Sequence, residues 1–532
     1  MTIRSIAQRG LATFAALTII ASLTACGSND SSDTNAPSAS VSASVDLGSA
    51  AVFLPSDGVT LSQHTPVNKW SVFGNALHDA LVKQGFAKRD VVTVKTDKLS
   101  DQAQEIEDYL NDLNKQQDSS STSASASTSG SASTSPTASS TEATKKRHTT
   151  LIVAPLTTPD DTTRQYGDYV TLPADADSTS SEDKKAERKS QEEAAGEAAM
   201  IDVLNKASDE GMSVILVSNT LEGYVPDAFV SMSDAKQIGR QQAKQLVSKL
   251  ALSRATKQNP RSIEIMLPNN NSDAFAKEAF AGIWEVLRPY FASGAAVCPS
   301  GLLNEKSDAN SWQAVTFKAN DQNAVEKELT HRLGMDSDSS DHPSIDGIIA
   351  MNDFVAYGVT SALNKLHYTG SSADINPQIS IGGIVNNMVG NKDLKKSPVP
   401  DPTVSPTTPT SSPSSGQTDT NSTDSSSAPA ADDPAWPIVT GYGAYATNLP
   451  SIVDGKQWST TMEDRFGYAS DTAQVAEALN RDKKITTIAK SQTTISKTKV
   501  PTVKRDLIEV SASNLKKAII DPGYASAADA GL

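Results

Sequence analysis

The sequence predicts an α/β protein with two doubly wound, parallel-sheet lobes joined by a hinge. Short β-branched runs alternate with amphipathic helical stretches, and this alternation occurs in two successive sets along the chain. A strand, a helix and a second strand in this rhythm make a right-handed crossover, which builds a parallel sheet covered on both faces. Two such sets give two rows of strand carboxyl ends, where ligands bind in folds of this class.

The first set of elements occupies the N-terminal part of the chain. A helix is predicted from Trp70, because Trp70, Phe73, Leu77 and Leu81 recur at helical spacing and Gly85 suits a C-terminal cap. The β-branched runs of this set predict strands at 51–55, 91–94, 150–155 and 213–218. The second set predicts strands at 263–267, 314–317, 347–351 and 437–442, and helices at about 280–290 and 355–366.

Cys26 stands where an apolar N-terminal run gives way to polar sequence. Arg4 and Arg9 precede an apolar stretch at 11–23, which is the layout of a secretory signal. The tetrapeptide LTAC that ends at Cys26 resembles the bacterial lipobox, so we expect lipidation of this cysteine and stable anchoring by its two acyl chains. An ordinary signal peptide, or a membrane span that happens to contain a cysteine, is the alternative. No later stretch approaches the roughly 20 apolar residues of a transmembrane helix.

Low-complexity tracts interrupt the two lobes. They are rich in Ser, Thr, Pro and charged residues, and with so few apolar side chains to bury we expect them to stay disordered. The expected organisation is a lipoprotein signal peptide (1–25), a flexible tether (26–48), an N-terminal lobe (49–257) with disordered insertions at about 116–147 and 175–197, a C-terminal lobe (258–462) with a disordered insertion at about 391–434, a return to the N-terminal lobe (463–499), and a C-terminal strand and helix (500–532).

Composition and motifs favour binding over catalysis. The net charge of −15 argues against nucleic acid as a partner, because a phosphate-binding face needs an excess of basic residues. The 6 histidines form no HExxH pattern, and neither a GxSxG elbow nor a GxxxxGK[ST] loop occurs. With Cys26 lipidated, Cys298 is the only free thiol, which leaves no internal disulfide and no cysteine-based metal site. We therefore expect neither an enzyme nor a cofactor.

Several stretches, in order along the chain, resemble segments of the type I periplasmic sugar-binding proteins. The resemblance runs from Val52 to Tyr524 apart from the low-complexity tracts, and it is closest to the xylose and multiple-sugar branch of solute-binding lipoproteins that serve ABC importers. The stretches are KW at 69–70, DAFAKEAFAGIWEVLRPYF at 273–291, SIDGIIAMNDFVAYGVTSALNKL at 344–366, PIVTGYGAYATNLPSIVDGKQWSTTMEDR with its G-x-Q-x-x-T pattern at 437–465, and VSASNLKKAIIDPGY at 510–524.

The resemblance implies a set of site residues. Trp70 and Phe317 correspond to ring-stacking aromatics, and Asp353 corresponds to an acid that binds ligand hydroxyls. The alternatives are that Trp70 and Phe317 belong to the core and that Asp353 is only the N-cap of the following helix. Trp458, on an alternating strand, is interpreted as packing. The full set of candidate substrate-binding residues is Trp70, Asn219, Asp273, Phe317, Asn352 and Asp353.

The chain departs from the family at several ligand positions. An Asp-Arg pair of the family is replaced by Ser218-Asn219, an Asp of the ligand loop by Gly443, and a Lys near the closing strand by Glu463. The family's Asn at the start of the helix near Phe280 corresponds to Phe275, with the nearby Asp273 as the alternative. Specificity for a pentose or a hexose is therefore not carried over to this chain.

These observations lead to one functional hypothesis and one alternative. The hypothesis is a lipid-anchored solute-binding protein of an ABC importer on the outer face of the cell membrane, which captures a carbohydrate-like molecule and presents it to the permease subunits. The alternative is a surface lipoprotein that keeps a degenerate two-lobed scaffold for sensing or for protein interaction.

Overall fold

The structure is a computed structural model that describes residues 46–57, 66–124, 148–156, 182–269, 273–336, 342–372 and 435–532. At 116–124 and 182–190 it describes the helical backbone only. The signal peptide, Cys26 and most of the expected tether lie outside the described residues, as do the insertion at 391–434 and most of that at 116–147.

The first sheet has seven strands in the order β12-β13-β5-β4-β3-β1-β2. Neighbouring strands are parallel except for the β12–β13 pair. Strands β1, β3 and β4 are almost wholly apolar and buried, as expected of central strands covered on both faces. The strands are β1 (Ser49–Pro55), β2 (Val91–Thr96), β3 (Thr149–Val153), β4 (Ser213–Val217), β5 (Ala228–Val230), β12 (Ser491–Ile495) and β13 (Thr498–Val503).

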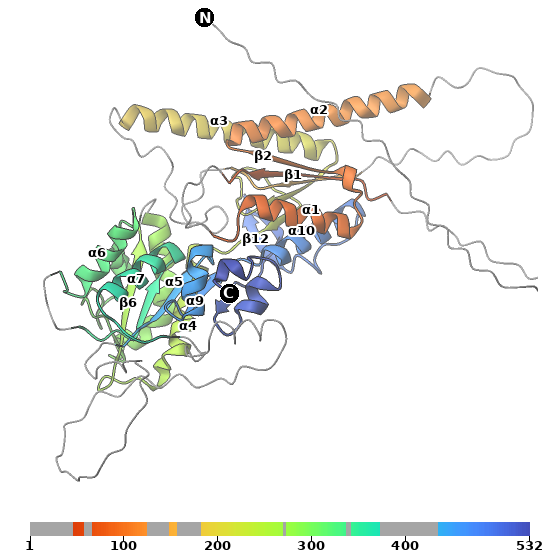
Figure 1. The fold of residues 1–532 in the computed structure, drawn as a ribbon. Helices are drawn as coiled ribbons and strands as arrows, with labels where there is room; N and C mark the ends of the chain where they lie inside the picture. The colour runs from red at the N-terminus through yellow and green to blue at the C-terminus, as the bar shows by residue number, and fades with distance from the viewer. Residues whose placement is uncertain are drawn as a thin grey trace, which may run out of the picture. The chain divides into compact units, whose positions relative to one another are not determined.

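Helices cover both faces of this sheet, and the alternation along β1 shows which helix covers which face. Val52 packs in a cluster with residues of α1 and α10, whereas Phe53 packs in a second cluster with residues of α2 and α3 (Figure 1). Helix α1 begins at Trp70 and is closed by Gly85 at φ 108°, which confirms the predicted helix and its cap. The helices are α1 (Trp70–Gln84), α2 (Leu99–Ala124), α3 (Glu182–Asp209), α10 (Arg465–Asn480) and the short 3₁₀ helix η1 (Lys88–Asp90).

The second sheet follows the order β14-β11-β10-β9-β6-β7, with β8 paired to β6. It too is parallel, except where the late strand β14 pairs antiparallel with β11. The strands are β6 (Arg261–Pro268), β7 (Ala296–Val297), β8 (Thr316–Phe317), β9 (Gly347–Ala350), β10 (Ile438–Tyr442), β11 (Ser459–Met462) and β14 (Ile508–Ser511).

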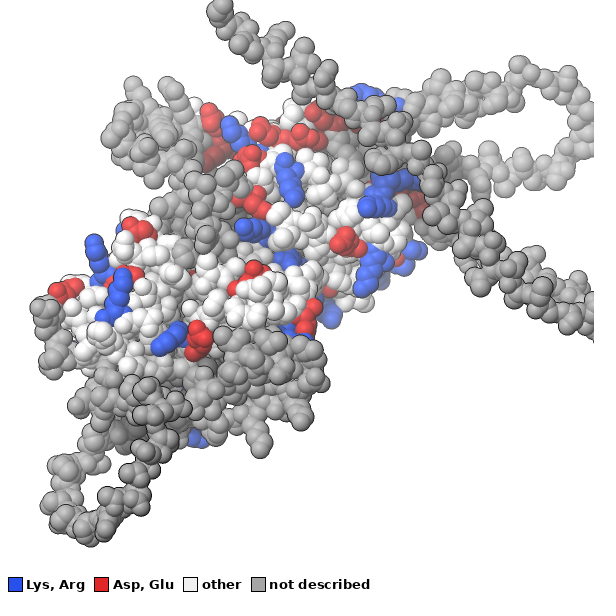
Figure 2. Space-filling view, viewed as in Figure 1, with Lys and Arg blue, Asp and Glu red and all other residues white. Residues whose placement is uncertain are grey.

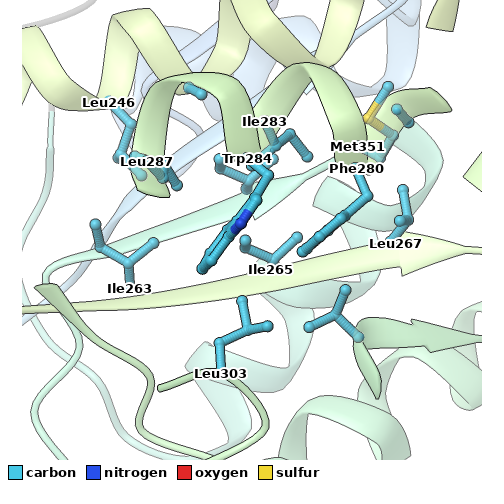
Figure 3. Close-up of a cluster of buried hydrophobic side chains, with 14 of the residues drawn as sticks. Leu246, Ile263, Ile265, Leu267, Phe280, Ile283, Trp284, Leu287, Leu303 and Met351 are labelled. Carbon is cyan, nitrogen blue, oxygen red and sulfur yellow. The ribbon is translucent and has the colours of Figure 1, made fainter. Parts of the chain in front are cut away.

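Helices α4 and α5 pack together over one face of the second sheet. Phe280 and Trp284 of α5 stack with ring centroids 5.4 Å apart and lie over Ile265 of β6 (Figure 3). The two helices approach closely at Gly282, where a Cβ would lie 2.0 Å from the carbonyl oxygen of Lys236. The remaining elements are α4 (Ala235–Lys249), α5 (Asp273–Ala292), α6 (Gln322–Arg332), α7 (Asp353–Lys365), α9 (Leu449–Val453), the 3₁₀ helices η2 (Leu252–Arg254), η3 (Ala309–Val315), η4 (Ala446–Asn448) and η6 (Ala528–Ala530), and the π-helix η5 (Lys516–Ile520).

A buried ion pair fastens α6 to the second sheet. Arg332 Nη1 lies 2.9 Å from Glu264 Oε1, and the two side chains are 2% and 0% exposed. The other guanidinium nitrogens bond Glu328 and the carbonyl oxygen of Val315, and the Cys298 thiol donates to Glu264. Each buried charge therefore has an opposite charge and further hydrogen bonds, which is the condition under which a buried pair is tolerated.

The chain passes between the two lobes three times: from β5 to α4, from β11 to α10, and from β13 to β14. The crossing segments are tied to one another. The Ser231 N–H donates to the Val503 carbonyl (2.9 Å), and Arg505 Nε pairs with Asp464 Oδ2 (2.6 Å). Two parallel-dominated sheets joined in this way confirm the predicted fold class.

The structure differs from the sequence-based expectations at several element and lobe boundaries. Part of the 175–197 tract is helical, because α3 begins at Glu182, and α2 continues to Ala124 inside the expected 116–147 insertion. Glu, Lys, Gln and Ala are strong helix formers, and a helix once nucleated extends through them at little cost. Residues 314–315 belong to η3 rather than to a strand, and the return to the N-terminal lobe runs to Val503 rather than to 499. The C-terminal lobe begins at α4 rather than at 258, because α4 packs in one core with α5 and β6. Within the described residues, no helix has the length and apolar character that crossing a bilayer requires.

Candidate functional site

Strand ends from both sheets meet at Glu463. This residue directly follows β11, and its Oε1 accepts a hydrogen bond from the backbone N–H of Ser233 (2.9 Å), which lies just beyond β5 of the other sheet. The hydroxyl of Tyr442, the last residue of β10, donates to the same oxygen (3.4 Å), and Asn68 Nδ2 donates to the Glu463 carbonyl (2.9 Å). We call Asn68, Ser233, Tyr442 and Glu463 the junction. Ligands of doubly wound folds bind outside the carboxyl ends of strands, which makes the junction the candidate binding site.

The Glu463 carboxyl group is almost completely buried, at 2% exposure. Burial raises its pKa to about 7, the hydrogen bonds from Ser233 and Tyr442 oppose the rise, and the nearby charge of Asp464 adds to it. Near neutral pH this group is therefore balanced between its protonated and ionised forms.

We expect the protein to lose stability as pH rises from about 4.5 to about 7. Over this range the folded state holds a proton on Glu463 that the unfolded state has released, so the free energy of unfolding falls with rising pH. Glu463→Gln removes the titrating group and should abolish about 3 kcal/mol of this pH dependence. The measurement is chemical denaturation of wild type and variant at pH 4.5 and pH 7.5. If the free energies of unfolding of wild type and variant differ by the same amount at pH 4.5 and at pH 7.5, the prediction is contradicted.

Asp353 is buried completely and organises the loop that follows β10. Its Oδ2 accepts hydrogen bonds from the Tyr445 N–H and the Thr460 hydroxyl (both 2.9 Å), and its Oδ1 accepts one from Gln457 Nε2 (2.7 Å). Burial raises the pKa of Asp353 to about 6, and these hydrogen bonds oppose the rise. The packing leaves no space at Gly441, where a Cβ would lie 2.1 Å from Asp353 Oδ1. In this conformation the carboxylate holds the loop to β11.

The N-cap of α7 is Asn352 and not Asp353. Asn352 Oδ1 accepts the hydrogen bond from the Val355 N–H (3.0 Å), so the interpretation of Asp353 as the N-cap is wrong. Asn352 is itself buried, and its Nδ2 has no hydrogen-bond partner among the described residues. Contact of either side chain with a solute stays a prediction.

Asn219 lies at the carboxyl ends of β3 and β4 in the first sheet. It follows Ser218, whose positive φ of 67° turns the chain sharply out of β4. Asn219 Nδ2 donates to the carbonyl of Pro155 just beyond β3 (3.0 Å), whereas its buried Oδ1 has no partner among the described residues. The structure therefore places a buried amide oxygen with unused bonding capacity at this sheet edge.

The two candidate stacking aromatics are packed in the cores of their lobes. Trp70 is 2% exposed and lies edge-on to Phe73, with ring centroids 5.9 Å apart. Phe317 is 8% exposed, and the Arg332 guanidinium lies over its ring at 5.7 Å. This packing favours the core interpretation of both residues.

Asp273 stands apart from the junction. It is exposed at the start of α5, where it accepts a hydrogen bond from Asn269 (2.7 Å), while Phe275 points into the core. Trp458 also belongs to that core, with Lys249 over its ring at 5.4 Å. None of the hydrogen bonds described for these residues reaches Glu463.

Several residues of the site escaped the sequence analysis. Asn68, Ser233 and Tyr442 join the junction through contacts between distant segments, and no local pattern marks them. Gln457 and Thr460 carried a signal, because they are the conspicuous polar residues of the Q-x-x-T stretch.

The face of the molecule shown in Figure 2 carries both acidic and basic side chains, which are scattered over its described surface.

Comparisons with known proteins identify a matching family profile and several similar proteins. The profile of the periplasmic binding protein domain family matches residues 193–387. The chain is 22% identical over 328 residues to the multiple sugar-binding periplasmic protein SbpA of Azospirillum brasilense, covering 61% of this chain and 70% of SbpA. It is also 22% identical over 327 residues to the multiple sugar-binding periplasmic receptor ChvE of Rhizobium radiobacter, with coverage of 61% and 70%. Among solved structures, an ABC transporter solute-binding protein from Clostridium phytofermentans with bound β-D-glucose is 16% identical to this chain. The aligned region covers 90% of this chain and 99% of the chain of that protein, with a TM-score of 0.46.

Proposed function

We propose that this chain is a type I periplasmic binding protein, which captures a sugar or sugar-like solute between its two lobes and delivers it to the permease of an ABC importer. The match of the periplasmic binding protein domain profile to residues 193–387 and the similarity to SbpA and ChvE support this proposal. The chain is a binding protein and not an enzyme. The lobes, each one sheet with its helices, rotate about the three crossing segments to enclose the solute, as hinged binding proteins do.

The observation that carries the proposal is the concentration of buried polar groups at the strand ends of both sheets. Glu463, Ser233 and Tyr442 lie together, and the amide groups of Asn219 and Asn352 each retain one atom without a hydrogen-bond partner in the described chain. A buried polar atom without a partner costs free energy, and the hydroxyl groups of a sugar both donate and accept hydrogen bonds. A polyhydroxylated solute supplies these missing partners.

A thermal-shift screen against D-glucose, D-xylose, D-ribose and myo-inositol, at concentrations up to the millimolar range, tests the proposal. A solute present at 100 times its Kd should stabilise the protein by about 2.7 kcal/mol, which is visible as a raised melting temperature. Asn219→Ala should weaken binding roughly three- to tenfold, because it removes one hydrogen bond. Lys257→Ala, at an exposed ion pair with Glu305, is the matched control and should bind like wild type.

We also propose that Cys26 anchors the protein by its lipid at the outer face of the cell membrane. The support is the lipobox-like LTAC sequence after a basic and then an apolar segment. Cys26→Ala should release the protein from the membrane fraction or leave an unprocessed precursor, which detergent partitioning and intact mass would detect. Unchanged partitioning and mass in the variant would contradict the anchor.

One observation favours the second candidate, a surface lipoprotein that uses the scaffold for sensing or for protein interaction. The carboxylate of Asp353 is bonded to the chain's own loop through Tyr445, Gln457 and Thr460. If solute binding has been lost, we expect the acid of the former site to bond groups of the protein itself, as Asp353 does. Failure of every carbohydrate and polyol to raise the melting temperature would favour this candidate over the importer.

A further inference from the structure

The junction holds a buried carboxyl group, that of Glu463, which is paired with no cation among the described residues. Its hydrogen bonds come from neutral donors only, namely the Ser233 N–H (2.9 Å), the Ser233 hydroxyl (3.5 Å) and the Tyr442 hydroxyl (3.4 Å). Within the described part of the chain, no Lys, Arg or His forms an ion pair with Glu463. The ionised form of such a carboxyl group is costly to bury without an opposite charge, so the presence of Glu463 at the carboxyl ends of the strands needs a reason.

The charged neighbours of Glu463 are engaged elsewhere. Asp464 pairs with Arg505 (2.6 Å), and Arg465 donates to the Val67 carbonyl (2.9 Å) and to Asn68 Oδ1 (3.3 Å). The phenol of Tyr468 interacts electrostatically with Glu463, and its hydroxyl group donates to the Ser231 carbonyl (3.1 Å).

Glu264, the other buried glutamate among the described residues, has a cationic partner, unlike Glu463. Glu264 is 0% exposed and is paired with Arg332 at 2.9 Å, so that burial is compensated inside the protein. Asp353 resembles Glu463 instead: its partners Tyr445, Gln457 and Thr460 are neutral donors. Both uncompensated acids touch the chain between Tyr442 and Tyr445, at the carboxyl end of β10. The two buried acids that have no cationic partner among the described residues therefore both lie at the candidate site.

We propose that the solute carries a positive charge, as an amine-bearing sugar does, and that its ammonium group pairs with Glu463. This inference rests on the proposed function and assigns the chemical class of its ligand. An ammonium group offers three donors and a full charge, which a hydroxyl group does not. Hydrogen bonds between charged partners are roughly twice as strong as neutral ones, and exclusion of water strengthens them further. In this assignment, Glu463 selects the amine and the amides of Asn219 and Asn352 bind hydroxyl groups.

Pairs of sugars that differ at a single substituent, an ammonium group in place of a hydroxyl group, test the inference. Calorimetry at pH 7.5 would compare D-glucosamine with D-glucose and D-galactosamine with D-galactose, and N-acetyl-D-glucosamine would serve as the neutral nitrogen-bearing control. We expect the amines to bind about 10- to 100-fold more tightly than their neutral counterparts. Glu463→Gln should remove this preference, whereas Glu305→Gln, a change at an exposed acid paired with Lys257, should keep it.

Proton release gives a second measurement on the wild-type protein, so the test does not depend on the variant folding. At pH 6 the free protein holds a proton on Glu463, and an ammonium group that pairs with the carboxylate must displace it. Calorimetry in two buffers of different ionisation enthalpy should then show net proton release on binding of the amine.

The outcomes separate this inference from the proposed function. Neutral sugars that bind as tightly as the amines, or binding of the amines without proton release, would overturn the amine assignment and leave sugar capture standing. If no sugar of either kind binds, both the assignment and the proposed function fail.

Discussion

Asp353→Ala should lower the free energy of unfolding by roughly 3 kcal/mol or more. The side chain is completely buried, and its removal leaves the Tyr445 N–H, Gln457 Nε2 and the Thr460 hydroxyl without the oxygen that accepts their hydrogen bonds. Each buried donor without a partner costs about 1–3 kcal/mol. Relief of the desolvation of the carboxylate offsets part of that sum. Urea denaturation of wild type and variant at pH 7 measures the difference.

Asp353→Asn is the matched control for this prediction. It keeps the size of the side chain and one acceptor oxygen, so it should lose clearly less stability than the alanine variant. Paired measurements of solute affinity separate a structural role from a ligand contact. If Asp353→Ala melts like wild type and binds solute at least tenfold more weakly, Asp353 is a ligand group and not an organiser of the loop.

Arg332→Met should destabilise the protein by about 3–5 kcal/mol. The substitution leaves Glu264, at 0% exposure, as a buried charge without its cation. It also removes the donors to the carbonyls of Ile265, within β6, and of Val315, next to β8. Chemical denaturation detects the loss.

The double variant Glu264→Met/Arg332→Met separates the charge effect from a packing effect. Replacing both members of a buried pair by apolar residues is often close to neutral, so the double variant should recover much of the stability that the single variant loses. A double variant that is as unstable as, or less stable than, Arg332→Met would show that the hydrogen bonds and packing of the guanidinium matter more than the pairing of charge.

Local patterns in the sequence were enough to predict the fold class. The helix from Trp70 to its cap at Gly85 follows from apolar spacing and from the tolerance of glycine for positive φ, and the structure confirms both. The buried strands β1, β4, β6 and β9 were predicted from their β-branched runs. These signals are local because helix and strand periods depend on residues a few positions apart.

The chemistry of the site was decided by contacts that no local pattern contains. Glu463 meets Ser233 across 230 positions of sequence, and Asp353 meets Tyr445 across 92. Whether an acid faces solute, caps a helix or holds a loop depends on which groups the tertiary fold brings within hydrogen-bond distance. Burial then sets its pKa, because the cost of losing water depends on everything packed around it. The sequence by itself determined two parallel sheets and where their strands end, whereas only the tertiary structure decided which side chains meet there and which buried acids have no cationic partner among the described residues.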